Sequence, residues 1–169
     1  MRNFTAFFIK SFVSVILISL FANWAINSFE EFVESNAKAR ANFVADTFIR
    51  YNYAVQNYVM ANPAVTGDIP EVSLDLPSSF KNSGFTNNVL RFGIARTWLP
   101  LAAITVSERD QVLNHLNIKL HSHPNSFHWG LVQSSGNFID EKGKRFVTNP
   151  EIVKDIPSGA ILIFSDLSH

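Results

Sequence analysis

The hydrophobic pattern begins with a long uncharged stretch at residues 11–29. A helix over this stretch would span ~28 Å, close to the ~30 Å hydrocarbon core of a bilayer. The alternative is a buried core helix, which seldom runs so far without a charge. Arg2 and Lys10 precede the stretch, and basic residues on a short leading flank favour a cytoplasmic N-terminus. Small residues suited to signal cleavage are poorly placed, so the pattern predicts a cytoplasmic leader at 1–10 and an uncleaved transmembrane signal anchor at 11–29.

Apolar residues recur at helical spacing over the next stretch, from 30 to 62. No Gly or Pro interrupts it, and Pro63 disfavours helical geometry in the residue before it. The apolar positions are three or four residues apart and form one seam. Its members are Val33, Ala37, Ala41, Val44, Phe48, Tyr51, Val55 and Tyr58. The pattern predicts an amphipathic helix.

This seam has two candidate partners, and its central positions are Val44, Phe48, Tyr51, Val55 and Tyr58. It would pack either on the chain's own domain or on the same helix of a second copy. Two alanines make a weak dimer seam, so we expect packing on the domain that follows.

Short apolar runs alternate with Pro- and Gly-containing turns over residues 63–169. The runs predict five strands and one helix. We expect strands at 72–76, 89–98, 127–133, 137–139 and 160–164, and a helix at 107–116 that Ser107 caps with Asp110. The predicted class is α+β, in which a transmembrane helix continues into a long amphipathic helix packed on a small, mostly antiparallel sheet. Residues 63–169 would form one domain with 30–62.

Composition excludes several functions. The chain carries 14 basic and 14 acidic residues, and a formal net charge of zero gives no electrostatic support for nucleic-acid binding. It has no Cys, which excludes disulfides, thiol catalysis and Cys-based metal sites. Its 16 Phe residues suit a core held together by packing alone.

Histidines form the one conspicuous chemical constellation. His121, His123 and His128 have a spacing that could supply three zinc ligands with one open position. However, no acid falls between Asp110 and Asp140 to act as a base or to orient a ligand. We therefore expect solvated loop histidines and no cofactor, with a zinc site or a pH-sensitive contact as alternatives.

Other catalytic signals are missing from the sequence. There is no Gly-x-Ser-x-Gly motif and no phosphate-binding glycine loop, so we expect a protein that is not an enzyme. Arg91 and Arg96 flank a predicted strand that carries Trp98. This group could bind an anion or a glycan, and an exposed strand face explains it equally well.

Three stretches have a recognisable composition: FIRYNYAVQNYVMANPAVTGDIPEVSLDLPSSF at 48–80, WGLVQSSGNFIDEKGKRF at 129–146 and DIPSGAILIF at 155–164. They resemble a known family, the PilM-type proteins of thin, type IVb conjugative pili. The first carries the family's aromatic helix, Asn-Pro, Gly and Leu-Pro positions. They are here Tyr51, Tyr53, Tyr58, Asn62, Pro63, Gly67, Leu76, Pro77 and Phe80.

The resemblance implies a non-enzymatic accessory subunit of a type IV pilus assembly apparatus. It would cross the bacterial inner membrane once, with a cytoplasmic N-terminus and a periplasmic C-terminal domain. Its partners would be other pilus assembly proteins, through periplasmic contacts, and inner-membrane lipid. The first alternative is a minor pilin-like subunit incorporated in the fibre. The less favoured one is an exported, His-liganded zinc hydrolase.

Overall fold

The structure is a computed structural model, and it describes most of the chain. The described residues are 2–80, 84–90, 93–100, 104–121, 127–134, 137–140, 145–146 and 150–167. The side chains of residues 2–15 and of a few others within these ranges are not described. The chain divides into two compact units, Met1–Ala39 and Arg40–His169.

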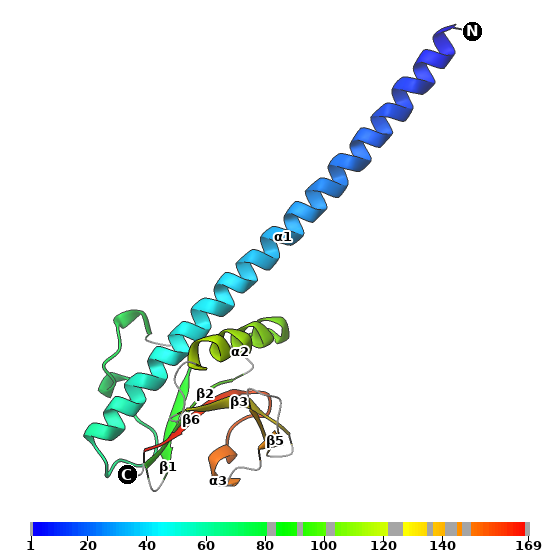
Figure 1. Cartoon of the computed structure of the whole chain (residues 1–169). Coiled ribbons are helices and arrows are strands. Elements are labelled where there is room, and N and C mark those ends of the chain that lie inside the picture. Colours follow the sequence, from blue (N-terminus) through cyan, green and yellow to red (C-terminus); the bar gives the residue numbers. More distant parts are fainter. Residues whose placement is uncertain are drawn as a thin grey trace. The chain divides into compact units, whose positions relative to one another are not determined.

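Helix α1 extends from Arg2 to Ala61 and contributes to both units (Figure 1). It ends immediately before Asn62 and Pro63, as the sequence predicts. There the Asn62 side chain donates to the carbonyl oxygen of Tyr58 at 2.9 Å and satisfies one of the free carbonyls of the last turn. In the first unit the described large apolar side chains are exposed. They are Ile16, Ile18, Leu20, Phe21, Trp24, Ile26, Phe29, Phe32 and Val33.

The predicted anchor at 11–29 is not found as a membrane-spanning helix in the described part of the chain. No helix among them combines the length and the apolar character that crossing a membrane requires. The predicted stretch at 11–29 includes residues 11–15 and 17, whose side chains lie outside the described set, as do those of the predicted leader at 1–10.

The second unit contains an antiparallel sheet with the strand order β1-β2-β6-β3-β4-β5. The strands are β1 (Thr86–Leu90), β2 (Ile94–Leu99), β3 (His128–Val132), β4 (Phe138–Asp140), β5 (Arg145–Phe146) and β6 (Ile161–Asp166). Besides α1, the described α-helices of this unit are α2 (Val106–Leu120) and α3 (Pro150–Val153). The predicted α+β class, a long helix on a small antiparallel sheet, is confirmed.

Alternate residues of the strands divide the core into two layers. Ala95, Leu99, Ile161 and Ile163 face one side and join the core cluster that contains α1 and α2 residues. Leu162 and Phe164 point to the other side, where they pack with Ile152 and Val153 of α3. Figure 1 shows α2 and α3 on opposite sides of the strands. The uninterrupted apolar run of β6 follows from its central place, because both of its faces are covered.

The structure places most of the α1 seam inside the second unit. Phe48, Tyr51 and Val55 are fully buried, and Val44 and Tyr58 are partly buried against the same cluster. The ring of Phe48 stacks on Phe85 with centroids 5.1 Å apart. The N-terminal end of the seam differs, because Val33 in the first unit is 50% exposed.

Two predicted strands are wrong. Residues 72–76 do not form an edge strand; Val72 and Ser73 belong instead to a 3₁₀ helix, η1 (Glu71–Ser73), closed by a hydrogen bond from the Leu74 N–H to the Glu71 carbonyl. The predicted strand at 89–98 is instead parts of β1 and β2, which pair as a hairpin. Gly93 precedes β2 with φ of 78°, a conformation that only glycine adopts without strain.

The predicted start of the second helix is also wrong. Thr105, and not Ser107, is the N-cap of α2, and Glu108 takes the place predicted for Asp110. The Thr105 hydroxyl accepts from the Glu108 N–H at 3.2 Å, and the Glu108 carboxylate accepts from the Thr105 N–H at 2.8 Å. This reciprocal pair is a complete capping box.

Candidate functional site

The predicted histidine group falls on separate elements. His121 is exposed at the end of α2, and His128 is exposed at the start of β3, where its ring stacks on Phe164 at 5.0 Å. His123 lies outside the described residues. Within the described part of the chain, no group of three or more His, Cys, Asp or Glu residues could hold a metal ion.

His115, a neighbour of this group in the sequence, takes part in the contact between α1 and α2. Its Nε2 lies 3.0 Å from Oδ1 of Asp46, and Nζ of Lys119 lies 3.8 Å from the same oxygen. A second contact lies nearer the start of both helices, before Asp46 on α1 and before His115 on α2. There Nε of Arg40 lies 3.1 Å from Oε1 of Glu108. These ion pairs connect the two helices along their line of contact.

Glu108 combines this ion pair with the capping box of α2. The Thr105 N–H that donates to the carboxylate lowers the pKa of Glu108, and Arg40 adds to the effect, while burial opposes it. The ionised form is therefore favoured in the folded chain. One side chain thus links the start of α2 to α1.

Three polar side chains on two successive turns of α1 contact the sheet, and we call Tyr51, Asn52 and Gln56 the α1 polar row. Oγ1 of Thr97 on β2 donates to Oδ1 of Asn52 at 3.0 Å. Nε2 of Gln56 donates to Oγ of Ser165 on β6 at 2.8 Å. Because each bond reaches a different strand, the row sets both the rotation and the translation of α1 on the sheet.

Tyr51 completes the row through Asn87 on β1. Nδ2 of Asn87 donates to the Tyr51 hydroxyl at 2.7 Å and to the Ile69 carbonyl at 3.0 Å, and its Oδ1 accepts from the Ile69 N–H at 2.9 Å. The Asn87 side chain therefore bonds to both backbone groups of Ile69, as the backbone of a neighbouring strand would, and holds this residue against β1. Burial raises the pKa of Tyr51, which keeps its hydroxyl neutral.

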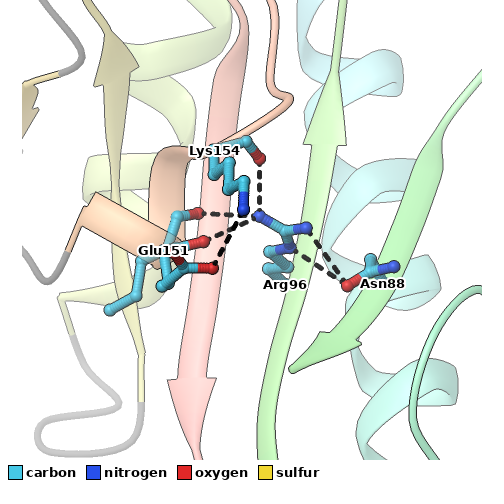
Figure 2. Close-up of polar contacts among 5 residues, drawn as sticks. Asn88, Arg96, Glu151 and Lys154 are labelled. Carbon is cyan, nitrogen blue, oxygen red and sulfur yellow. Dashed lines mark hydrogen bonds and ion pairs between the residues drawn. The ribbon is translucent and has the colours of Figure 1, made fainter. Parts of the chain in front are cut away.

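Arg96 is the buried cation on the opposite face of the sheet, and only 5% of it is exposed. Figure 2 shows its guanidinium between Asn88 on β1 and the carbonyl oxygens at the end of α3. Nη1 lies 3.1, 3.3 and 2.8 Å from the carbonyl oxygens of Glu151, Ile152 and Lys154. Nε and Nη2 both donate to Oδ1 of Asn88. Arg96 therefore caps α3 with a side chain from the sheet.

The same geometry corrects one sequence hypothesis. An anion or glycan site at Arg96 is wrong, because internal carbonyl oxygens occupy the guanidinium and the Trp98 ring lies 5.6 Å from it. Arg91, the other residue of that hypothesis, lies outside the described residues. Burial lowers the pKa of Arg96, while Asp155, Asp68 and Glu151 oppose that shift. In the sequence, the one signal that Arg96 could cap α3 was its position within the mainly apolar strand IARTWL.

The described polar clusters thus connect secondary-structure elements to one another, as in a small α+β protein organised around one long helix. A family model described as PilM matches residues 15–164, which include that helix from residue 15 onward, strands β1 to β5, and β6 as far as Phe164. The chain belongs to the PilM family. Comparisons with curated proteins and with solved structures find no match.

Membership of this family connects the chain to pili and to their assembly. It is consistent with the resemblance of residues 48–80, 129–146 and 155–164, all of which lie within the matched range. The type IVb subtype is not part of what the match shows.

Proposed function

We propose that the chain is a non-enzymatic accessory subunit of a conjugative or thin type IV pilus assembly apparatus, and that it acts through protein–protein contacts in the periplasm. The observation that carries this proposal is the use of the buried polar groups. Asn52, Gln56, Asn87 and Arg96 all bond to other elements of the same fold. These buried groups stabilise the fold, and we propose that the surface of this stable fold makes the contacts with other proteins.

The proposed location is the bacterial inner membrane, with the N-terminus in the cytoplasm. The support is the uncharged stretch at 11–29 behind Arg2 and Lys10. A second support is the exposure of large apolar side chains on α1, from Ile16 to Val33, because water solvates such surfaces poorly.

A second candidate function is a minor pilin-like subunit of the fibre. One observation favours it: α1 continues without interruption from Arg2 to Ala61. A continuous helix with exposed apolar side chains would suit packing among the helices of neighbouring subunits equally well.

The experiment that separates the two uses cells that lack the chain and cells that carry a tagged, full-length copy. Sheared fibres and membrane fractions are probed for the chain, in-cell crosslinks are mapped, and its intact mass is determined. An accessory subunit should restore fibres, stay in the membrane fraction at full-length mass and crosslink to other pilus proteins. Recovery in sheared fibres with a shortened N-terminus would show the pilin-like role instead. Normal fibres without the chain would contradict both.

A further inference from the structure

The exposed side of α1 in the second unit carries two neighbouring clefts. One, of about 390 Å³, lies between α1 and the segment that holds Ser73 and Asp75. The other, of about 250 Å³, lies between α1 and the end of α2 at Lys119 and Leu120. Arg50 and Tyr53 line both clefts, so the two share one wall. We call these clefts and the side chains between them the Arg50 surface.

The Arg50 surface has the composition of a protein-contact site. Tyr53 and Tyr58 line the larger cleft together with Arg50, and Tyr and Arg are the residues on which binding energy most often depends. The ring of Tyr53 packs edge-on against Phe127 with centroids 5.3 Å apart. A ring that is already held in place loses little conformational entropy on binding.

Charge on this surface centres on Arg50. The side chain is exposed and makes no ion pair with any described residue. The acid of the smaller cleft, Asp46, is already bonded to His115 and lies 3.8 Å from Lys119. Arg50 and Lys119 therefore outnumber the single acid in that cleft. The larger cleft has Asp75 opposite Arg50, so its two charges balance.

We propose that the Arg50 surface binds an acidic peptide segment of another pilus protein. A carboxylate of the segment pairs with Arg50 at the smaller cleft, where the excess charge is positive. Apolar side chains next to that carboxylate enter the clefts against Ile49 and the tyrosine rings. The backbone of the segment, or a basic side chain, donates to Asp75. This inference rests on the proposed function, since it specifies the chemistry of the partner contact.

The test is an array of overlapping 15-residue peptides that tile the other proteins of the same pilus system and this chain itself. Each peptide that contains Asp or Glu is also present with the corresponding amide. The purified full-length chain, its Arg50→Glu variant and its Lys38→Glu variant are applied. Lys38 is exposed on α1 outside the clefts, so Lys38→Glu changes the net charge equally and serves as the matched control.

The expected result is binding of acidic peptides that falls roughly tenfold or more on the amide replacement and with Arg50→Glu, and stays unchanged with Lys38→Glu. Arg50→Gln should show an intermediate loss, and unchanged thermal melting of the variants would establish that they remain folded. No bound peptide, bound peptides without an acid, equal loss in the Lys38→Glu control, or binding confined to peptides of this chain would overturn the proposal.

Fibre production in the same variants separates this inference from the proposed function. If the chain is needed for fibres and Arg50→Glu still supports them, the inference fails while the proposed function stands. If cells without the chain make normal fibres, the proposed function fails. If fibres are lost with Arg50→Glu and retained with Lys38→Glu, and the array shows the expected binding, both the proposed function and this inference are supported.

Discussion

The two faces of the sheet are held by different chemistry. On the α1 face, three neutral side chains of the helix each reach a different strand, through Asn87, Thr97 and Ser165. On the α3 face, one cation, Arg96, bonds to Asn88 and to three carbonyl groups. Neutral hydrogen-bonded groups cost little to bury, whereas a buried charge costs several kcal/mol unless it is well bonded, by rough estimates.

The difference follows from the size of the two helices. The part of α1 in the second unit buries a long row of large side chains, so its polar contacts need only select one position. Helix α3 has four residues, and those with described side chains that are buried are Ile152 and Val153. A helix that short gains little from burial, and we infer that Arg96 supplies the contacts that hold it on the sheet.

The largest expected effect concerns the apolar contacts of the α1 face. Phe48→Ala should destabilise the chain by about 3–5 kcal/mol, because it removes a fully buried ring that stacks on Phe85. Phe43→Ala is the matched control, since Phe43 lies on the same helix and is 71% exposed. It should change stability by about 0.5 kcal/mol or less. Urea unfolding followed by tryptophan fluorescence measures both, and equal midpoints would show that α1 does not depend on this core.

The next largest effect concerns the cation of the α3 face. Arg96→Met should destabilise by about 3 kcal/mol, because it leaves buried carbonyl groups without a donor. Arg96→Lys should destabilise less than Arg96→Met, because an ammonium group keeps the charge and can still donate. It should remain less stable than the parent, because the ammonium lacks the fork of the guanidinium and cannot reach all of the same oxygens. The same unfolding measurement would detect both changes. A more stable Arg96→Met variant would show that the cation costs more than it contributes.

On the α1 face, Asn87→Ala should cost about 1–3 kcal/mol. It leaves the Ile69 N–H and carbonyl and the Tyr51 hydroxyl without their bonds to this amide. Amide hydrogen exchange should report faster exchange at Ile69. Unchanged exchange there would mean that the bridge between Gly67 and Val89 alone holds the segment.

A smaller effect is expected where both partners of a neutral pair are replaced together. Asn52→Leu with Thr97→Val removes donor and acceptor at once, so the double variant should lie within about 1 kcal/mol of the parent. Each single variant should be less stable than the double one, because it leaves one polar group unpaired. A double-mutant cycle with no coupling would contradict the direct bond between the two side chains.

The smallest effect concerns the pH dependence of the Glu108 contacts, which are chiefly the capping box with Thr105 and secondly the ion pair with Arg40 of α1. The folded chain holds the pKa of Glu108 below the ordinary value of 4.5, so the unfolded chain binds its proton more readily. This contribution to stability is present above pH 4.5 and is lost as the pH falls below it. Glu108→Gln should flatten that part of the profile of unfolding free energy against pH. A parallel profile would show that other carboxylates dominate there.

Local patterns in the sequence predicted the long helix, its end before Pro63, the last strand and the fold class. They did not separate a strand from the 3₁₀ segment at 71–73, because Val72, Leu74 and Leu76 alternate in either case. Only in the structure does Val72 prove to be 90% exposed. The turn through Gly93 was missed because apolar residues continue on both sides of it.

The polar contacts were beyond sequence reasoning for a different reason. Arg96 bonds to carbonyl groups 55 to 58 residues further along the chain, and Gln56 to Ser165, 109 residues away. No spacing in a single sequence reports such partners. The histidines, by contrast, lie close together in the sequence, yet His121 and His128 fall on separate elements of the fold.

The order of synthesis gives the strand order a further consequence. Of the six described strands, β6 is the last to leave the ribosome, yet it lies between β2 and β3 and pairs with both of them in the sheet. Until Ile161–Asp166 are available, β1 with β2 and β3 with β4 and β5 have no common hydrogen-bonded partner. The sheet therefore closes only after translation has passed Asp166.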